Sequence, residues 1–416
     1  MNQCILLKSV LHQGKVVDIL IENNRFKKIA EFMEVPLGAT VISCKDKAIL
    51  PPFYNAHTHA AMTLFRGYAD DMPLMRWLSE YIWPLEGKLD AEAIEAGTRL
   101  AILEMIKSGT VFFSDMYWFR EASIKPVEEM GVRAAIGVTF AEVLANDAAP
   151  NFKFLRDHYQ DYSDRVQLAV MPHAIYTVGE KLLRECADIA EELDLKLHIH
   201  LAETEGEETR SLTPTQGKSP VRYLESLGVL SPRVIAAHAI HVSAEDIALL
   251  REKKVTVVHN PASNMKLSSG IFPMPDMLRA GVKIALGTDG AASNNNLDMR
   301  ESMKFATLLA KVAYKDPELL PAASVFDMAT VNGAEAYGID AGVIAEGKLA
   351  DAILLDLNNE RFVPNYNLIS NWVYSADSRA IDTVICNGKI LMQNGYVEGE
   401  EEIIARAREI CTRLLR

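Results

Sequence analysis

The chain has 416 residues, a length that fits one large barrel-type domain with an appendage or two to three ordinary domains. It is 49% hydrophobic and 24% charged, which excludes a disordered chain, a collagen and a coiled coil. The 43 Lys and Arg against 56 Asp and Glu give a net charge of −13, so sequence-independent binding of nucleic acid is not expected. No apolar run approaches the ~20 residues of a membrane span, and no membrane association is expected.

The five cysteines lie far apart, and the sequence contains no C-x-x-C. An odd, scattered set is typical of reduced thiols and not of a disulfide framework. The first residues become polar too early for a signal peptide. We therefore expect a cytoplasmic protein, and the sequence is compatible with a homo-oligomer.

Both ends of the chain show the pattern of short β-hairpins. Residues 17–29 contain two β-branched runs about an Asn-Asn pair. Residues 352–357 resemble a strand, and residues 381–392 contain two runs about Asn-Gly, a strong hairpin signal. We expect the two ends, 1–50 and 345–416, to form one small β-sandwich domain with a C-terminal helix.

The middle of the chain alternates between expected strands and helices. Asp90 to Lys107 is the clearest helix. Strands that alternate with helices pair in parallel, and eight such units favour an α/β fold, a (β/α)8 TIM-type barrel over residues 51–344. A doubly wound sheet fits less well because no G-x-G-x-x-G follows any strand. The eight expected strands are 49–57, 110–115, 132–140, 166–173, 196–201, 233–238, 255–259 and 283–288.

Histidines gather at the ends of these expected strands. His57 and His59 end the first strand, and a spacing of two places both imidazoles on one face, as two ligands of one ion require. In a parallel barrel all strand ends of this kind meet at one rim, where polar side chains need partners. Three histidines with an aspartate suit Zn²⁺ or another borderline divalent ion. The further residues at strand ends are His173, His200, His238 and Asp289.

The fifth strand carries two histidines and is followed by a glutamate. His200 is nearer the carboxyl end and is the expected ligand, whereas His198 lies one layer deeper and is interpreted as a hydrogen-bonded core histidine. Glu203 directly follows this strand, where a carboxylate can reach the open side of an ion and act as a general acid or base. The roles of His241 and His259 stay undecided; His259 ends the seventh strand, where it could support the ligands.

Several stretches together resemble the amidohydrolase superfamily, in its mononuclear deaminase branch. The resemblance rests on His57-Thr58-His59, His200-Leu201-Ala202-Glu203, Ala237-His238 and the run from Gly287 to Asn294. More closely, Trp83-Pro84-Leu85-Glu86 and the run from Thr288 to Asn294 resemble the 5′-methylthioadenosine/S-adenosylhomocysteine deaminases and their chlorohydrolase-like relatives. The likeness covers nearly the whole chain, including both β-rich ends.

The resemblance implies a single divalent ion in the barrel. Zn²⁺ is the expected ion, and Fe²⁺ and Mn²⁺ are alternatives. The expected fourth strand, 166–173, contains no lysine, so the carbamylated bridge of two-metal members is absent. The implied ligands are His57, His59, His200 and Asp289.

The resemblance also implies a mechanism for this ion and the residues around it. Asp289 and His238 orient the attacking water, whose pKa the ion lowers, and accept its proton. Glu203 delivers a proton to a ring nitrogen of the purine, and ammonia leaves from C6. The implied contacts to the nucleoside are Glu86 at the ribose diol, His173, Glu203 and Ser293.

The implied function is metal-dependent hydrolytic deamination of an adenine nucleoside: 5′-methylthioadenosine, S-adenosylhomocysteine or adenosine. The nucleoside and water are then the expected small-molecule partners. One alternative is an amidohydrolase acting on another heteroaromatic ring, such as guanine, a pterin or a chloro- or amino-triazine. A second is a non-catalytic scaffold, which the complete set of ligands and acid/base residues argues against.

One departure from the family concerns the substrate's tail. The family usually places an arginine after the third strand to hold the amino-acid carboxylate of S-adenosylhomocysteine. Here the segment 139–147 contains no basic residue, and the first one is Lys153. Lys153 or Arg156 could pair with the carboxylate instead. Otherwise a neutral thioether or adenosine is the expected substrate.

Overall fold

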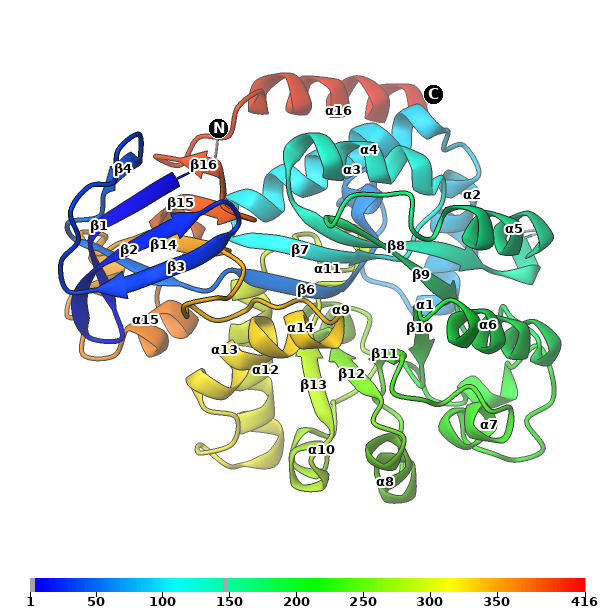
Figure 1. Ribbon diagram of the computed structural model, residues 1–416. Coiled ribbons are helices and arrows are strands. Elements are labelled where there is room, and N and C mark those ends of the chain that lie inside the picture. Colours follow the sequence, from blue (N-terminus) through cyan, green and yellow to red (C-terminus); the bar gives the residue numbers. More distant parts are fainter. Residues whose placement is uncertain (1–3, 145–147, 416) are drawn as a thin grey trace.

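The computed structural model describes residues 4–144 and 148–415 and contains an eight-stranded parallel sheet curled into a barrel (Figure 1). Each strand pairs in parallel with the next one along the chain. The two edges meet where the backbone N–H of Asp289 donates to the carbonyl of His57, at 3.1 Å. The predicted (β/α)8 barrel is confirmed. Its strands are β6 (Phe53–Thr58), β7 (Thr110–Asp115), β8 (Arg133–Phe140), β9 (Val166–Pro172), β10 (Lys196–Leu201), β11 (Val234–His238), β12 (Thr256–His259) and β13 (Lys283–Leu286).

The first expected strand, 49–57, is wrong in one respect. The structure divides this stretch into β5 (Lys47–Leu50) and β6, with Pro51 and Pro52 between them. β5 leaves the barrel and pairs antiparallel with β14 (Ala352–Asp356). Proline has no backbone N–H to donate to a sheet. Pro51 and Pro52 therefore end the hydrogen bonding of β5 in one sheet before β6 begins in the barrel.

Helices surround the barrel, and some of them begin at a residue whose side chain caps the helix. The helix predicted from Asp90 to Lys107 is α3 (Ala91–Lys107), and the Asp90 side chain accepts the N–H of Ala93 at its start. No helix among residues 4–144 and 148–415 is long and apolar enough to cross a membrane. The others around the barrel are α1 (Leu74–Trp77), α2 (Trp83–Glu86), α4 (Arg120–Met130), α5 (Ala148–His158), α6 (Glu180–Glu192), α7 (Pro220–Ser226), α8 (Ala244–Glu252), α9 (Pro261–Lys266), α10 (Met274–Ala280), α11 (Ala291–Asn294), α12 (Met299–Tyr314), α13 (Ala322–Ala329) and α14 (Val331–Ala336).

A second sheet combines strands from both ends of the chain, seen as blue and orange arrows in Figure 1. Its order is β16-β15-β14-β5-β1-β2-β3, and β4 pairs with β1. Both predicted hairpins and the small β domain are confirmed, whereas its exact boundaries remain a prediction. The C-terminal helix α16 (Glu400–Leu414) packs along α3 of the barrel, and α15 (Leu368–Tyr374) packs on α12 and α13. The remaining strands are β1 (Cys4–His12), β2 (Lys15–Glu22), β3 (Arg25–Ala30), β4 (Thr40–Ser43), β15 (Ile381–Cys386) and β16 (Lys389–Gln393).

Candidate metal centre and active site

His57 and His59 stand at the carboxyl end of β6, inside the rim of the barrel. His57 is fully buried, and neither of its ring nitrogens has a hydrogen-bond partner in the described part of the chain. The Nδ1 of His59 lies 2.7 Å from the carbonyl oxygen of Met116, so Nδ1 carries the hydrogen. The Nε2 of His59 is therefore free to act as a ligand.

His200 and Asp289 approach these histidines from the ends of β10 and β13. The Nδ1 of His200 donates to the carbonyl of His173 at 2.8 Å, and its Nε2 lies 3.3 Å from the Nε2 of His59. The Oδ1 of Asp289 lies 3.3 Å from the Nε2 of His59 and 3.5 Å from that of His57. The donor atoms of His200 and Asp289 thus lie next to that of His59 at the rim of the barrel, and Asp289 also lies next to His57.

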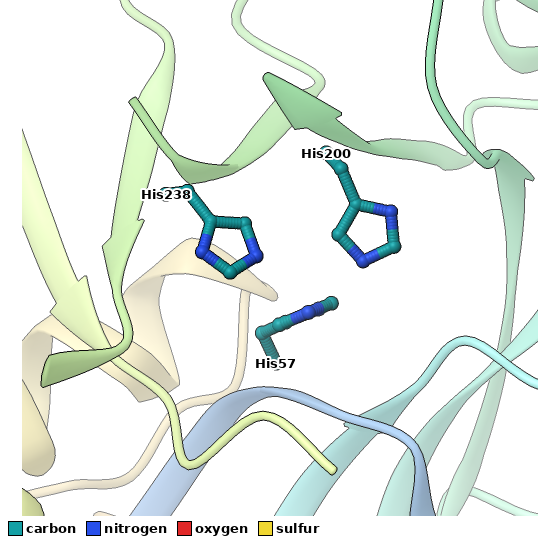
Figure 2. Close-up of side chains that lie close together, drawn as sticks. All are labelled: His57, His200 and His238. Atoms are coloured by element: carbon teal, nitrogen blue, oxygen red, sulfur yellow. The ribbon is translucent and has the colours of Figure 1, made fainter. Parts of the chain in front are cut away.

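These separations fit a divalent metal ion. Four N and O ligands at 2.0–2.1 Å around tetrahedral Zn²⁺ place neighbouring donor atoms about 3.3–3.4 Å apart. The separations are 3.3 Å for His59–His200, 3.3 Å for His59–Asp289 and 3.5 Å for His57–Asp289. Figure 2 shows His57, His200 and His238 converging from different strands, and their nearest nitrogens lie within 4.8 Å of one another.

The electrostatics of the four side chains also suit a cation. Burial lowers the pKa of His57 to about 4 and holds the pKa of His200 well below its usual value, so both offer unprotonated nitrogens. Burial opposes charge on His59, yet Asp289 beside it raises the His59 pKa to about 9. A positive charge is therefore favoured between Asp289 and the histidines.

His238 and Glu203 lie on the other side of this point. The Nδ1 of His238 lies 2.8 Å from the Oδ1 of Asn264, so Nδ1 carries the hydrogen and the bare Nε2 faces the site. That Nε2 is 3.9 Å from a carboxylate oxygen of both Glu203 and Asp289. Burial raises the pKa of Glu203, although His238 opposes this effect. Glu203 is thus suited to hold and release a proton.

One cavity joins the metal-binding point to the expected substrate contacts. Its wall contains Glu86, His173 and Ser293 together with His59, His200, Glu203, His238 and Asp289. Aromatic side chains supply much of the rest, a composition typical of small-molecule sites. These are Trp77, Trp83, Tyr117, Trp118 and Tyr176. Burial raises the pKa of Glu86 to about 7.

Comparison with known proteins identifies the family. Residues 48–391 match the model of the Amidohydrolase family. The chain belongs to this family. It is 45% identical over 410 residues to the 5′-deoxyadenosine deaminase of Methanothermobacter thermautotrophicus, covering 96% of both chains. It is 49% identical over 398 residues to 5-methylthioadenosine/S-adenosylhomocysteine deaminase 1 of Archaeoglobus fulgidus, covering 93% of both.

A solved structure extends the likeness to three dimensions. The adenosine deaminase of Xanthomonas campestris, solved with bound zinc, superposes with a TM-score of 0.93 at 32% identity. The alignment covers 99% of this chain and 98% of that one. This amidohydrolase therefore shares the fold of both the barrel and the second sheet with a zinc-containing deaminase.

In this amidohydrolase, three strand ends have backbone conformations that side chains rarely adopt. Ala202, His238 and Asp289 have φ values of +49°, +75° and +62°. The left-handed region is costly for residues with a Cβ and is found mostly where the surrounding structure imposes it, often at active sites. The sharp turns aim Glu203, His238 and Asp289 into the barrel mouth.

Several residues of the site were not predicted from the sequence. Asn264 orients His238, and Ser263 donates to the Oδ2 of Asp289 at 2.6 Å. Ser269 donates to Glu203 at 3.3 Å. All three follow β12, whose end also carries the unassigned His259; that histidine is buried against Phe272.

Two further histidines and the two basic residues considered for the substrate carboxylate do not line the cavity. His198 is buried, with its Nδ1 3.1 Å from the Ser114 hydroxyl, consistent with a core histidine. His241 contacts the carbonyl of Ser269 and lines no part of the cavity. Lys153 and Arg156 form exposed ion pairs with Asp157 and Glu192, so neither is placed to reach a substrate. Residues 145–147 of the segment after the third strand lie outside the described residues.

Proposed function

We propose that this amidohydrolase is a metal-dependent deaminase of adenine nucleosides, which replaces the amino group at C6 by oxygen and releases ammonia. The observation that carries this proposal is that one cavity contains a donor set for a divalent ion, a proton donor and a proton acceptor. The names of the Methanothermobacter and Archaeoglobus relatives support an adenine nucleoside with a modified 5′ position.

We propose Zn²⁺ as the ion, held by His57, His59, His200 and Asp289. Three nitrogens and one carboxylate oxygen are a usual zinc set, and the related Xanthomonas enzyme contains zinc. When bound, the ion supplies Lewis acidity that makes a water molecule nucleophilic near neutral pH. The hydrogen bonds from His59 and His200 to backbone carbonyls fix the rings in the orientation that binding needs.

His238 and Asp289 act on the attacking water. The bare Nε2 of His238 can accept a hydrogen bond or a proton, because Asn264 fixes the hydrogen on Nδ1. The Oδ2 of Asp289 lies 3.9 Å from this nitrogen, so one water oxygen can form hydrogen bonds with both atoms. The two side chains thus hold the nucleophile on one face of the purine and remove its proton.

Glu203 supplies a proton to the purine ring. Burial raises its pKa and so favours the protonated carboxyl, which can donate to a basic ring nitrogen. Protonation of that nitrogen makes C6 more electrophilic. The proton that His238 and Asp289 removed from the water passes to the departing amine, and the C6 hydroxyl proton returns to Glu203 as the carbonyl forms and ammonia leaves. Glu86, His173 and Ser293 bind the nucleoside, with Glu86 at the ribose hydroxyls, since all three line the same cavity.

A substrate panel tests this function. Purified protein loaded with Zn²⁺ is mixed with adenosine, 5′-deoxyadenosine, 5′-methylthioadenosine and S-adenosylhomocysteine, and with guanine, a pterin and a chlorotriazine. Ammonia release and loss of adenine absorbance from the adenine nucleosides alone are expected. Turnover of only the other rings would overturn the proposal and favour the alternative ring substrates.

A further inference from the structure

We propose that Arg120, in a second cavity next to the active site, binds a carboxylate at the end of the substrate's 5′ substituent. The inference rests on the proposed function and adds detail to its substrate range. It predicts that the enzyme accepts adenine nucleosides with an anionic 5′ substituent as well as neutral ones. Arg120 is the first residue of α4, the helix that follows β7. It does not belong to the segment after β8, where the resemblance to the family led us to expect an arginine.

The second cavity continues the first. Both share Trp83, Glu86, Tyr117, Trp118 and Thr139 as common wall residues. The second cavity adds Gly87, Phe119, Arg120, Gly137 and Asn151, and none of the proposed metal ligands lines it. The junction between the two cavities therefore runs past Glu86.

The order of groups along a nucleoside matches this layout. With the base at Glu203 and His238 and the ribose at Glu86, the 5′ carbon lies on the side away from the ion. A substituent on that carbon then extends into the second cavity. The aromatic faces of Trp83 and Trp118 suit a thioether and its methylene groups.

Arg120 is held in place at this cavity by neutral contacts. Its guanidinium stacks on the Phe154 ring at 3.7 Å, and its Nη1 donates to the Oδ1 of Asn151 at 3.1 Å. Among the residues that the structure describes, the carboxylate of the exposed Glu121 lies 3.8 Å from its Nη2. No hydrogen-bond acceptor among the described residues meets its Nε. The positive charge is thus held in place, and its ion-pair partner in the described part of the chain is an exposed carboxylate at 3.8 Å.

The charge balance of the cavity points to an anion as the ligand. Among the described lining residues, Arg120 is the cation, and the only carboxylate is Glu86 at the junction. Burial lowers the pKa of the Arg120 guanidinium, a sign that it is poorly solvated. A carboxylate satisfies such a group through two parallel hydrogen bonds, which neutral 5′ groups cannot make.

A substrate–variant cycle tests the assignment. The kcat/KM for S-adenosylhomocysteine is compared with that for 5′-propylthio-5′-deoxyadenosine, a thioether without the carboxylate, in wild type and Arg120→Gln. The variant should lower the ratio of the two values about 10- to 100-fold, the range for a lost hydrogen-bonded charge pair. Arg120→Lys should recover part of that ratio because it retains the charge.

Arg156→Gln is the matched control, since Arg156 is an arginine outside both cavities, and its ratio should equal that of wild type. Zinc content and the unfolding midpoint report whether each variant is folded. An equal fall for both thioethers, or no fall, would overturn the role of Arg120. If wild type releases no ammonia from any adenine nucleoside, the proposed function itself has failed, which is a separate result.

Discussion

The carboxylate of Glu207 accepts a hydrogen bond from the backbone N–H of Glu203, with 2.9 Å between N and Oε2. Its other oxygen accepts the N–H of Ala202 at 3.1 Å. Glu207 is buried, and burial raises its pKa to about 7 although the two N–H groups oppose this. The buried acid therefore fixes the turn after β10 from which Glu203 enters the cavity.

Replacement of Glu207 by Gln should disturb catalysis through Glu203. Gln keeps one acceptor oxygen but directs an NH₂ group at the second backbone N–H, so the turn must shift. We expect kcat to fall about 10-fold or more with zinc content retained, because a small misplacement of a catalytic group is costly. Glu205→Gln is the matched control in the same loop, since Glu205 is exposed. Unchanged kcat in Glu207→Gln would show that the turn does not need this carboxylate.

Replacement of Glu203 by Gln tests the proton donor directly. The amide has nearly the same shape but cannot transfer a proton, so kcat should fall about 10²- to 10⁴-fold. Zinc content should stay at the wild-type level because Glu203 is not among the proposed ligands. Both are measured on one preparation, by ammonia release and by elemental analysis. Near-normal turnover would remove Glu203 from the proton path.

The fold and much of the site follow from patterns that the sequence displays. Alternating strands and helices predict the barrel, and His57, His200 and Asp289 stand at strand ends that a parallel barrel must bring together. The division of the first strand at Pro51 was missed because apolar residues continue across it. Local hydrophobicity alone cannot show that one continuous apolar segment contributes strands to two different sheets.

Other parts of the site depend on loop conformation and could not be predicted. Glu205, Glu207 and Glu208 look alike in the sequence, and only the folded turn buries Glu207. Arg120 resembles any charged residue at a helix start until α5 supplies Asn151 and Phe154 around it. Such contacts join segments that are distant in the sequence, so they cannot be predicted from the periodicity or the spacing of residues.

Removal of His200 should weaken metal binding. His200→Ala deletes one of four proposed donors, and zinc affinity should fall by more than about 100-fold, since loss of a residue that only supports a ligand already costs 10- to 100-fold. His241→Ala is the control, because His241 lines no part of the cavity and lies outside both groups of candidate ligands. Competition with a chelator measures the affinity. Full zinc occupancy of His200→Ala under that competition would show that another residue is the ligand.

The pH dependence of ribose recognition should follow Glu86. Burial raises its pKa to about 7, so the side chain is neutral below this pH and becomes a carboxylate, the better acceptor for two hydroxyls, above it. The ratio of kcat/KM for adenosine to that for 2′,3′-dideoxyadenosine should therefore rise about tenfold between pH 6 and pH 8. Taking the ratio cancels any pH effect on the chemical step, because that effect acts on both substrates. Glu86→Gln should give a low ratio that does not change with pH, and a rising ratio in that variant would assign the titration to another group.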